Sequence, residues 1–227
     1  MAGSLDGPRL EPKSGTARQL IVFLHGYGAD GNDLIEIGRA WQEQLPDAAF
    51  VSPHAPRPCG QAPMGREWFP LTFRDPNERW TGVNAAAPTL NAFLDAELAR
   101  RGLPASALAL VGFSQGTMMS LHVGLRRAAA PAAIVGYSGM LVTPEDVEPD
   151  AFMKEIVSRP PVLLVHGDQD QLIPVQALLH ASQGLAAMGV AVQWHISPGV
   201  GHGIDQEGLR HGGAFLARIF GSKTKAG

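Results

Sequence analysis

Short apolar runs alternate along this chain with segments of helical periodicity, and this alternation constrains the fold more than any other feature. The runs are typical of strands buried on both faces, and we expect strands at residues 19–25, 48–52, 108–113, 133–137, 161–166 and 190–196. Helices are expected at residues 32–44, 84–101, 115–127, 174–188 and 209–220. Strands that alternate with helices favour a mostly parallel central sheet flanked by helices. The predicted fold class is therefore α/β.

The domain organisation is expected to be simple, because 227 residues suit one domain and no repeat or break in composition marks a second. We expect a single domain over residues 19–221. An N-terminal extension, poorly ordered or extended, would cover residues 1–18, and a C-terminal tail residues 222–227. Residues 53–82 lack clear periodicity but are rich in proline, glycine and aromatic side chains. A stretch of this kind is more often functional than idle, so we expect it to cover the sheet edge or the site.

Charge and composition exclude several classes of partner. The formal net charge of -3 gives no basic patch for nucleic acid. A single cysteine, Cys59, excludes an internal disulfide and a cysteine cluster for a metal. No apolar leader and no run of about 18 apolar residues occurs, so neither a signal peptide nor a membrane span is expected. A cytoplasmic location is the default. An apolar loop could close against a symmetric partner, which leaves a homodimer as an alternative to a monomer.

The segment Gly112-Phe-Ser114-Gln-Gly116 has the pattern Gly-x-Ser-x-Gly between a predicted strand and a predicted helix. At such a sharp turn, the two glycines allow the strand and helix backbones to approach closely, and the serine Oγ projects above the sheet. The N-terminus of the helix favours developing negative charge. We therefore predict that Ser114 is a catalytic nucleophile. The alternative is that Ser114 merely caps the helix.

A serine hydroxyl needs a base to remove its proton, and the base needs a partner to hold its tautomer. In α/β-hydrolases the chain order is serine, acid, histidine. Two aspartates follow a predicted strand: Asp170, farther out along the loop, is favoured as the acid, and Asp168 is better placed to bind loop amides. His202, in a glycine-rich loop after the last strand, is the predicted base. The other histidines are expected to be packed, solvated or loop-bracing: His25, His54, His122, His166, His180, His195 and His211.

The oxyanion of a tetrahedral intermediate needs about two fixed donors. One should be the backbone N–H of Gln115, the residue after the nucleophile. The other should come from the glycine-rich loop after the first long strand, and we choose the N–H of Tyr27. A glycine-rich loop can also be a simple tight turn or a phosphate-binding loop. This one lacks both G-x-G-x-x-G and the P-loop pattern, so a nucleotide site is not expected.

These motifs resemble the phospholipase/carboxylesterase family of α/β-hydrolases, which includes bacterial carboxylesterases and eukaryotic acyl-protein thioesterases. The resemblance extends over residues 19–220. It is carried by His25-Gly-Tyr-Gly28, Gly112-Phe-Ser-Gln-Gly116, His166-Gly-Asp-Gln-Asp170 and Gly201-His202, with Arg66-Glu-Trp-Phe-Pro-Leu71 similar to a tryptophan-containing loop of the bacterial branch. The resemblance implies an α/β-hydrolase fold without a separate cap domain, the triad of Ser114, Asp170 and His202, and neither metal nor cofactor. Thr117 departs from it, since many members have glycine there; we expect only local helix packing to change.

The expected function is that of a serine carboxylesterase, which hydrolyses short- to medium-chain carboxylic esters through an acyl-enzyme. The acyl chain should rest on apolar side chains of the irregular stretch, although ordinary packing is an alternative for each: Met64, Trp68, Phe69 and Leu71. Alternatives on the same scaffold are an acyl-protein thioesterase, a lysophospholipase, an amidase or a peptidase. A catalytically silent binding protein is the alternative of another class, because a scaffold alone does not determine function.

Overall fold

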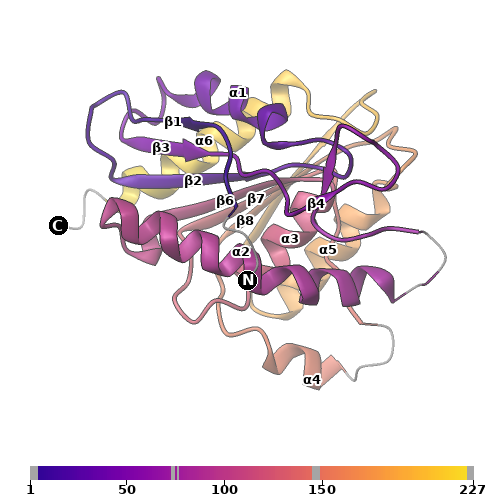
Figure 1. Cartoon of the computed structure of the whole chain (residues 1–227). Coiled ribbons are helices and arrows are strands. Elements are labelled where there is room, and N and C mark those ends of the chain that lie inside the picture. The colour runs from indigo at the N-terminus through magenta and orange to yellow at the C-terminus, as the bar shows by residue number, and fades with distance from the viewer. Residues whose placement is uncertain (1–4, 73–74, 76, 145–148, 224–227) are drawn as a thin grey trace.

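A seven-stranded sheet forms the centre of the computed structural model, which describes residues 5–72, 75, 77–144 and 149–223 (Figure 1). The strand order is β1-β3-β2-β6-β7-β8-β9, and every neighbouring pair is parallel except β1 with β3. The strands are β1 (Arg9–Leu10), β2 (Gln19–Leu24), β3 (Ala48–Val51), β6 (Leu108–Phe113), β7 (Ala133–Tyr137), β8 (Val162–Gly167) and β9 (Val192–Ser197). The predicted α/β fold with a mostly parallel central sheet is confirmed.

Helices cover both faces of this sheet, which explains why its strands are apolar along their whole length. Leu20 and Val22 of β2 pack into the core under α2 (Glu78–Arg101) and α3 (Gln115–Gly124). Ile21 and Phe23 point the other way, into the core under α1 (Gly31–Trp41) and α6 (Gln206–Lys223). A third cluster lies between α3, α4 (Pro149–Lys154) and α5 (Gln176–Ala187). Alternate residues of a strand face opposite sides, so a sheet covered twice needs apolar residues at every position.

Several details differ from the expectation. Helix α2 begins at Glu78 rather than near residue 84 and contains Pro88; burial of Leu90 and Leu94 against the sheet maintains the helix despite the proline. The irregular stretch contains a short antiparallel pair, β4 (Arg57–Pro58) and β5 (Arg66–Glu67). These strands and α4 are too short to show a hydrophobic period. Residues 1–4 and 224–227 of the expected terminal segments lie outside the described residues.

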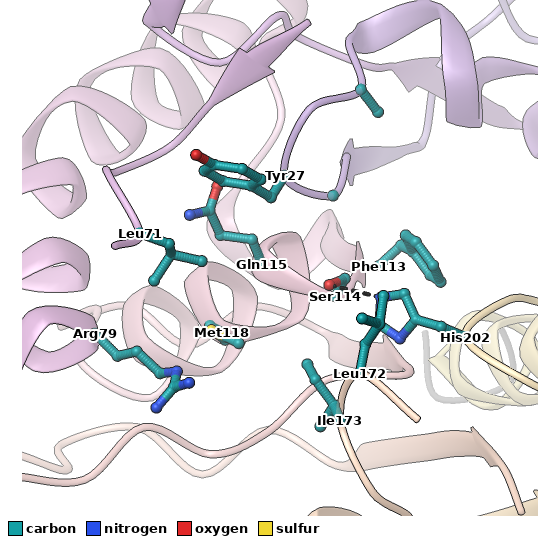
Figure 2. A pocket seen from close by; sticks show the side chains of 12 residues that line it. Tyr27, Leu71, Arg79, Phe113, Ser114, Gln115, Met118, Leu172, Ile173 and His202 are labelled. Carbon is teal, nitrogen blue, oxygen red and sulfur yellow. Dashed lines mark hydrogen bonds between the residues drawn. The ribbon is translucent and has the colours of Figure 1, made fainter. Parts of the chain in front are cut away.

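The carboxyl ends of the parallel strands meet at one edge of the sheet. Segments after β2, β6, β8 and β9 bring together Tyr27, Ser114, Ile173 and His202 there, as Figure 2 shows. None of the helices in the described ranges combines the length and the apolar character that a membrane span requires.

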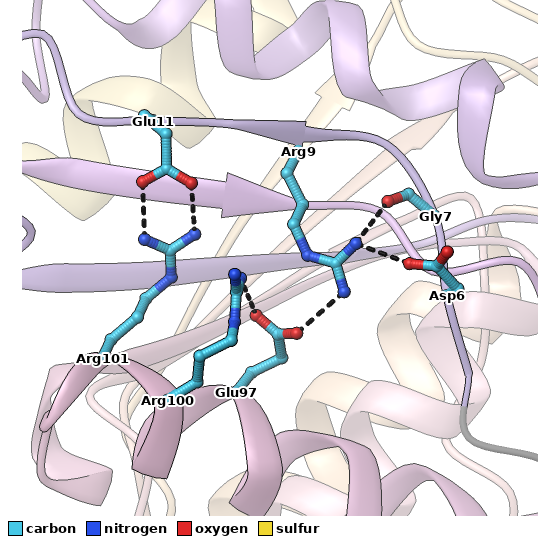
Figure 3. A network of polar contacts seen from close by, with 7 residues as sticks. All are labelled: Asp6, Gly7, Arg9, Glu11, Glu97, Arg100 and Arg101. Carbon is cyan, nitrogen blue, oxygen red and sulfur yellow. Dashed lines mark hydrogen bonds and ion pairs between the residues drawn. The ribbon is translucent and has the colours of Figure 1, made fainter.

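A polar network fastens the segment before β2 to helix α2 (Figure 3). Arg9 of β1 donates to Glu97 over 2.9 Å, and Arg100 donates to the other Glu97 oxygen over 2.7 Å. Arg101 forms a two-pronged pair with Glu11, at 2.7 and 2.9 Å. Burial would raise the pKa of Glu97, but the hydrogen bonds from Arg9 and Arg100 outweigh it and lower that pKa. Part of the segment that the sequence suggested as an extension is therefore an edge strand with partners on α2.

Replacing Glu97 with glutamine should lower the free energy of unfolding by about 1 to 3 kcal/mol, because Glu97 is only 5% exposed and its carboxylate is shared by Arg9 and Arg100. Urea denaturation near neutral pH measures the change. The matched control is Glu36→Gln, which removes an exposed ion pair with Arg39 on α1 and should cost at most about 0.5 kcal/mol. Equal losses in the two variants would contradict the role given to this network.

Candidate active site

Ser114 lies at the turn between β6 and α3 in a backbone conformation that residues with side chains seldom adopt, with φ 53° and ψ -115°. A Cβ on Gly112 would collide with the backbone of Gly116, and a Cβ on Gly116 would collide with the carbonyl oxygen of Leu24 in β2. Only glycine therefore fits on either side of this turn. Within the described residues Ser114 makes no side-chain capping bond to α3. Its half-buried hydroxyl is directed elsewhere.

That hydroxyl forms a continuous line of hydrogen bonds with two side chains from other loops. The Nε2 of His202 lies 3.0 Å from the Oγ of Ser114, a contact drawn in Figure 2. The Nδ1 of His202 lies 2.7 Å from Oδ2 of Asp170. A carboxylate can only accept, so it selects the tautomer with a proton on Nδ1 and leaves Nε2 free to accept from the serine. The structure thus brings together the three residues predicted for these roles.

Asp170 is 6% exposed and has every oxygen engaged. Its Oδ1 accepts from the backbone N–H groups of Leu172 and Ile173, both at 2.9 Å. His166 Nε2 lies 3.2 Å from Oδ2 and donates to the carbonyl of Ile173 over 2.7 Å. Burial would raise the pKa of Asp170, but the hydrogen bonds from Ile173, His202 and Leu172 outweigh it and lower that pKa. The group facing His202 is therefore an anion at neutral pH.

Asp168 has a different environment from Asp170. It is exposed, and its Oδ1 accepts from the backbone N–H of Gly199 over 2.7 Å. The next residue, Gln169, donates its N–H to the carbonyl of Val200 over 2.9 Å. These two bonds join the loop after β8 to the loop that carries His202. Asp168 binds a loop amide, as the sequence suggested, and holds together the loops that carry Asp170 and His202.

Thr117, the departure from the family pattern, ties α3 to two strands. Its hydroxyl lies 2.9 Å from the carbonyl oxygens of both Gly112 and Tyr137. A Cβ on Gly136 or Gly139 would collide with the Thr117 side chain, so glycines on the neighbouring strand and loop make the room that the threonine needs. The change is accommodated by local packing beneath Ser114.

The two amides expected to form an oxyanion hole lie at the wall of one cavity. Tyr27 and Gln115 both line it beside Ser114 and His202. Gln115 is the first residue of α3, where N–H groups have no partner within the helix. Among the described residues, neither the Tyr27 nor the Gln115 amide donates to another protein group. Both amides are therefore available to a ligand, and their role as oxyanion donors stays a prediction.

The irregular stretch braces the loop that carries Tyr27. Gly28 donates its N–H to the carbonyl of Arg66 over 2.9 Å, and Arg66 returns its N–H to Ala29 over 2.7 Å. The indole of Trp68 donates to the carbonyl of His25 over 3.0 Å. These bonds hold residues 25–29 against the irregular stretch. The stretch thus lies at the site, where these hydrogen bonds support the loop and Leu71 lines the cavity.

The cavity has a volume of about 220 Å³ and opens beside the reactive hydroxyl (Figure 2). Its wall is mainly apolar, with Leu71, Phe113, Met118, Leu172 and Ile173 among the lining residues. A wall of this kind suits a hydrocarbon chain. Met118 could have been anticipated, because it lies four residues after Ser114 on the same helix face. Arg79, which also lines the cavity, has no signal in the sequence that marks it.

Of the four side chains expected to hold an acyl chain, Leu71 lines this cavity and the other three do not. Trp68 and Phe69 are 2% and 1% exposed and belong to the core under α2 and α3. The side chain of Gln115 connects to both, accepting from the Trp68 N–H over 2.9 Å and donating to the Phe69 carbonyl over 2.8 Å. Met64 is 94% exposed at a separate surface hollow. Aromatic side chains next to a core bury themselves in it, which composition alone does not reveal.

His25 braces its own loop, as expected. Its Nδ1 donates to the carbonyl of Gly26 over 2.8 Å, and its Nε2 accepts from the N–H of Ala55 over 2.9 Å. Complete burial lowers the pKa of His25 to about 4. The neutral ring is the form that can make both hydrogen bonds.

Comparison with known proteins agrees with this geometry. A family model described as phospholipase/carboxylesterase matches residues 5–219. The crystal structure of esterase PE8 superimposes with a TM-score of 0.90 and 45% sequence identity, covering 96% of this chain and 100% of that one. Esterase YpfH of Escherichia coli strain K12 is 29% identical over 195 residues, 86% of this chain and 80% of that protein. Acyl-protein thioesterase 1 of Gibberella zeae is 25% identical over 230 residues, 96% of this chain and 97% of that protein.

The buried neutral His25 predicts a loss of stability in acid. Its pKa is about 6.5 in the unfolded chain and about 4 in the folded one, so the unfolded chain binds the proton first as the pH falls. The contribution of His25 to the free energy of unfolding is complete above pH 6.5 and declines by about 3 kcal/mol toward pH 4. Urea denaturation from about pH 7 to pH 4 should show a weaker pH dependence in His25→Gln than in the wild type. Parallel curves would contradict this assignment.

Proposed function

Because the chain belongs to the phospholipase/carboxylesterase family of α/β-hydrolases, we propose that it hydrolyses short- to medium-chain carboxylic esters through an acyl-enzyme on Ser114. The observation that carries the proposal is the line from Ser114 Oγ to His202 Nε2, at 3.0 Å, and from His202 Nδ1 to Asp170, at 2.7 Å. A hydroxyl becomes an effective nucleophile when an oriented base can take its proton. The esterases among its relatives support the same reaction.

In the first half of the reaction, the Oγ of Ser114 attacks the carbonyl carbon of the ester while His202 Nε2 takes the hydroxyl proton. The Asp170 carboxylate stabilises the imidazolium that results. The negative oxygen of the tetrahedral intermediate accepts from the N–H groups of Tyr27 and Gln115. Collapse of the intermediate breaks the bond to the alcohol oxygen, which leaves with the proton from Nε2. The acyl group is then attached to Ser114.

In the second half, water takes the place of the serine. His202 Nε2 accepts a proton from the water as its oxygen attacks the acyl carbon, and a second tetrahedral intermediate forms. Its collapse breaks the bond to the Oγ of Ser114, which recovers the proton from Nε2. The carboxylic acid departs and the free enzyme is restored.

A thioester is the alternative substrate class, since acyl-protein thioesterase 1 of Gibberella zeae matches nearly the whole chain. The same residues would act, with a thiol as the leaving group. Esters and thioesters of equal acyl length, compared by kcat/KM, decide between the two classes. The cytoplasmic location expected from the sequence stays a prediction, and the homodimer stays an alternative to a monomer.

A fluorophosphonate probe should label Ser114 covalently, because the reagent reacts with a serine that an adjacent base activates. Mass spectrometry of the digested protein identifies the modified peptide. Ser114→Ala should abolish labelling and ester hydrolysis together. A folded wild-type protein that resists the probe would instead favour the silent binding protein.

Two neighbouring aspartates give a matched test of the acid. Asp170→Asn should lower kcat on the order of 10⁴-fold, because an amide at this position can favour the wrong imidazole tautomer. Asp168→Asn keeps an oxygen that can accept from Gly199 and should lower kcat by no more than about tenfold, with its main effect on stability. Steady-state kinetics on one ester measures both variants, and circular dichroism checks their folding. A larger loss of kcat in Asp168→Asn than in Asp170→Asn would assign the acid to Asp168.

A further inference from the structure

We propose that Arg79 recognises an anionic group on the substrate, so that the preferred esters carry a carboxylate or phosphate on the part that enters the cavity. The inference rests on the proposed ester hydrolysis at Ser114. It names the charge that the substrate carries in the cavity and the residue that recognises this charge.

Arg79 is placed to meet a bound ester. It is the second residue of α2 and lines the same cavity as Ser114 and His202. Figure 2 shows its side chain extending from the helix toward the cavity, across from His202 and next to Met118. The wall between them is largely apolar, with Leu71 and Met118 among the residues. A substrate arm that starts at Ser114 and follows this wall approaches the guanidinium.

The guanidinium has no partner in the described part of the chain. No hydrogen bond or ion pair joins Arg79 to another described residue, whereas Arg66, also half-buried, donates to two carbonyl oxygens. The carboxylates that lie near Arg79 in the sequence are engaged elsewhere. Asp75 accepts from the Asn77 N–H over 2.9 Å, and Glu78 accepts from both the N–H and the hydroxyl of Thr72 over 2.7 Å.

The other polar side chains of the cavity are already committed. Gln115 uses its amide on Trp68 and Phe69. The Tyr27 hydroxyl lies near the side chains of Cys59 and Glu67, and burial together with these neighbours raises the pKa of Tyr27. Apart from the catalytic residues and the backbone amides of Tyr27 and Gln115, Arg79 is therefore the charged donor that the described cavity wall offers to a ligand.

The chemistry of guanidinium determines what suits this position. Once a bound substrate displaces water from the cavity, a charge beside the apolar wall is unfavourable unless it is paired. Arginine offers a planar fork of N–H donors that matches the two oxygens of a carboxylate or the oxygens of a phosphate. A neutral ester leaves the fork without a partner, and an anionic ester provides one. The preference should appear as discrimination between substrates that differ only in this charge.

Two pairs of esters test the proposal and distinguish the two positions of the anion. In the first pair, aryl half-esters of a graded series of dicarboxylic acids are compared with the same esters whose distal carboxylate is a carboxamide. In the second pair, an acyl group on glycerol 3-phosphate is compared with the same acyl group on glycerol. For each pair, the measured quantity is the ratio of kcat/KM for the anionic ester to kcat/KM for the neutral one. A ratio cancels any change in catalysis that both esters share.

The wild type should favour the anionic ester in at least one pair, and Arg79→Gln should lower that ratio by about 10- to 100-fold. Arg79→Lys should retain part of the preference, because it keeps the charge and loses the fork. The preference should weaken at high salt. Arg39→Gln removes an exposed arginine on α1 and should leave the ratio unchanged. The pair that responds identifies whether the anion belongs to the acyl or the alcohol part.

A wild-type ratio no greater than one in both pairs, or a ratio that Arg79→Gln does not alter, would overturn the inference. In that case neutral esters are still hydrolysed and the fluorophosphonate probe still labels Ser114, so the proposed function stands. If none of the esters is hydrolysed and the probe does not react, the proposed function itself fails. Cooperative thermal unfolding of Arg79→Gln verifies that the variant is folded.

Discussion

The close crossing of β2, β6 and α3 is the constraint on which the rest of the site depends. The backbone of α3 passes so near the carbonyl of Leu24 that Gly116 can have no side chain, and Gly112 is restricted in the same way by the helix. The turn between them forces Ser114 to a positive φ, which costs about 1 to 3 kcal/mol for a residue with a side chain. The packing of both sheet faces stabilises this conformation, and the hydroxyl stands at the sheet edge as a result.

The loops around Ser114 are held by one another as much as by the sheet. The irregular stretch supports the loop of Tyr27 through Arg66 and Trp68, and the loops of Asp170 and His202 are joined through Asp168. A catalytic distance near 3 Å requires such support, because a loop without it would sample many positions. The site is therefore a small set of cross-braced loops on a rigid sheet.

The sequence predicted the parts of this arrangement that depend on local pattern. Apolar runs located the six long strands, and the glycines around Ser114 predicted the sharp turn. The spacing of Asp170 and His202 after their strands placed both at the right edge. The cavity wall could not be predicted in the same way, because Trp68 and Phe69 have the composition of a substrate pocket but pack into the core. Arg79 gave no signal either, since only the path of α2 brings it to the cavity.

Two residues of the loop after Asp170 contribute both to the orientation of the Asp170 carboxylate and to the wall of the cavity. Leu172 and Ile173 offer their backbone amides to the carboxylate and their side chains to the cavity. Any residue other than proline retains the amide. The shape of the cavity can therefore diverge at these two positions while the orientation of the imidazole is preserved. Substitutions at these two positions can therefore change the range of substrates without changing the groups that transfer the proton.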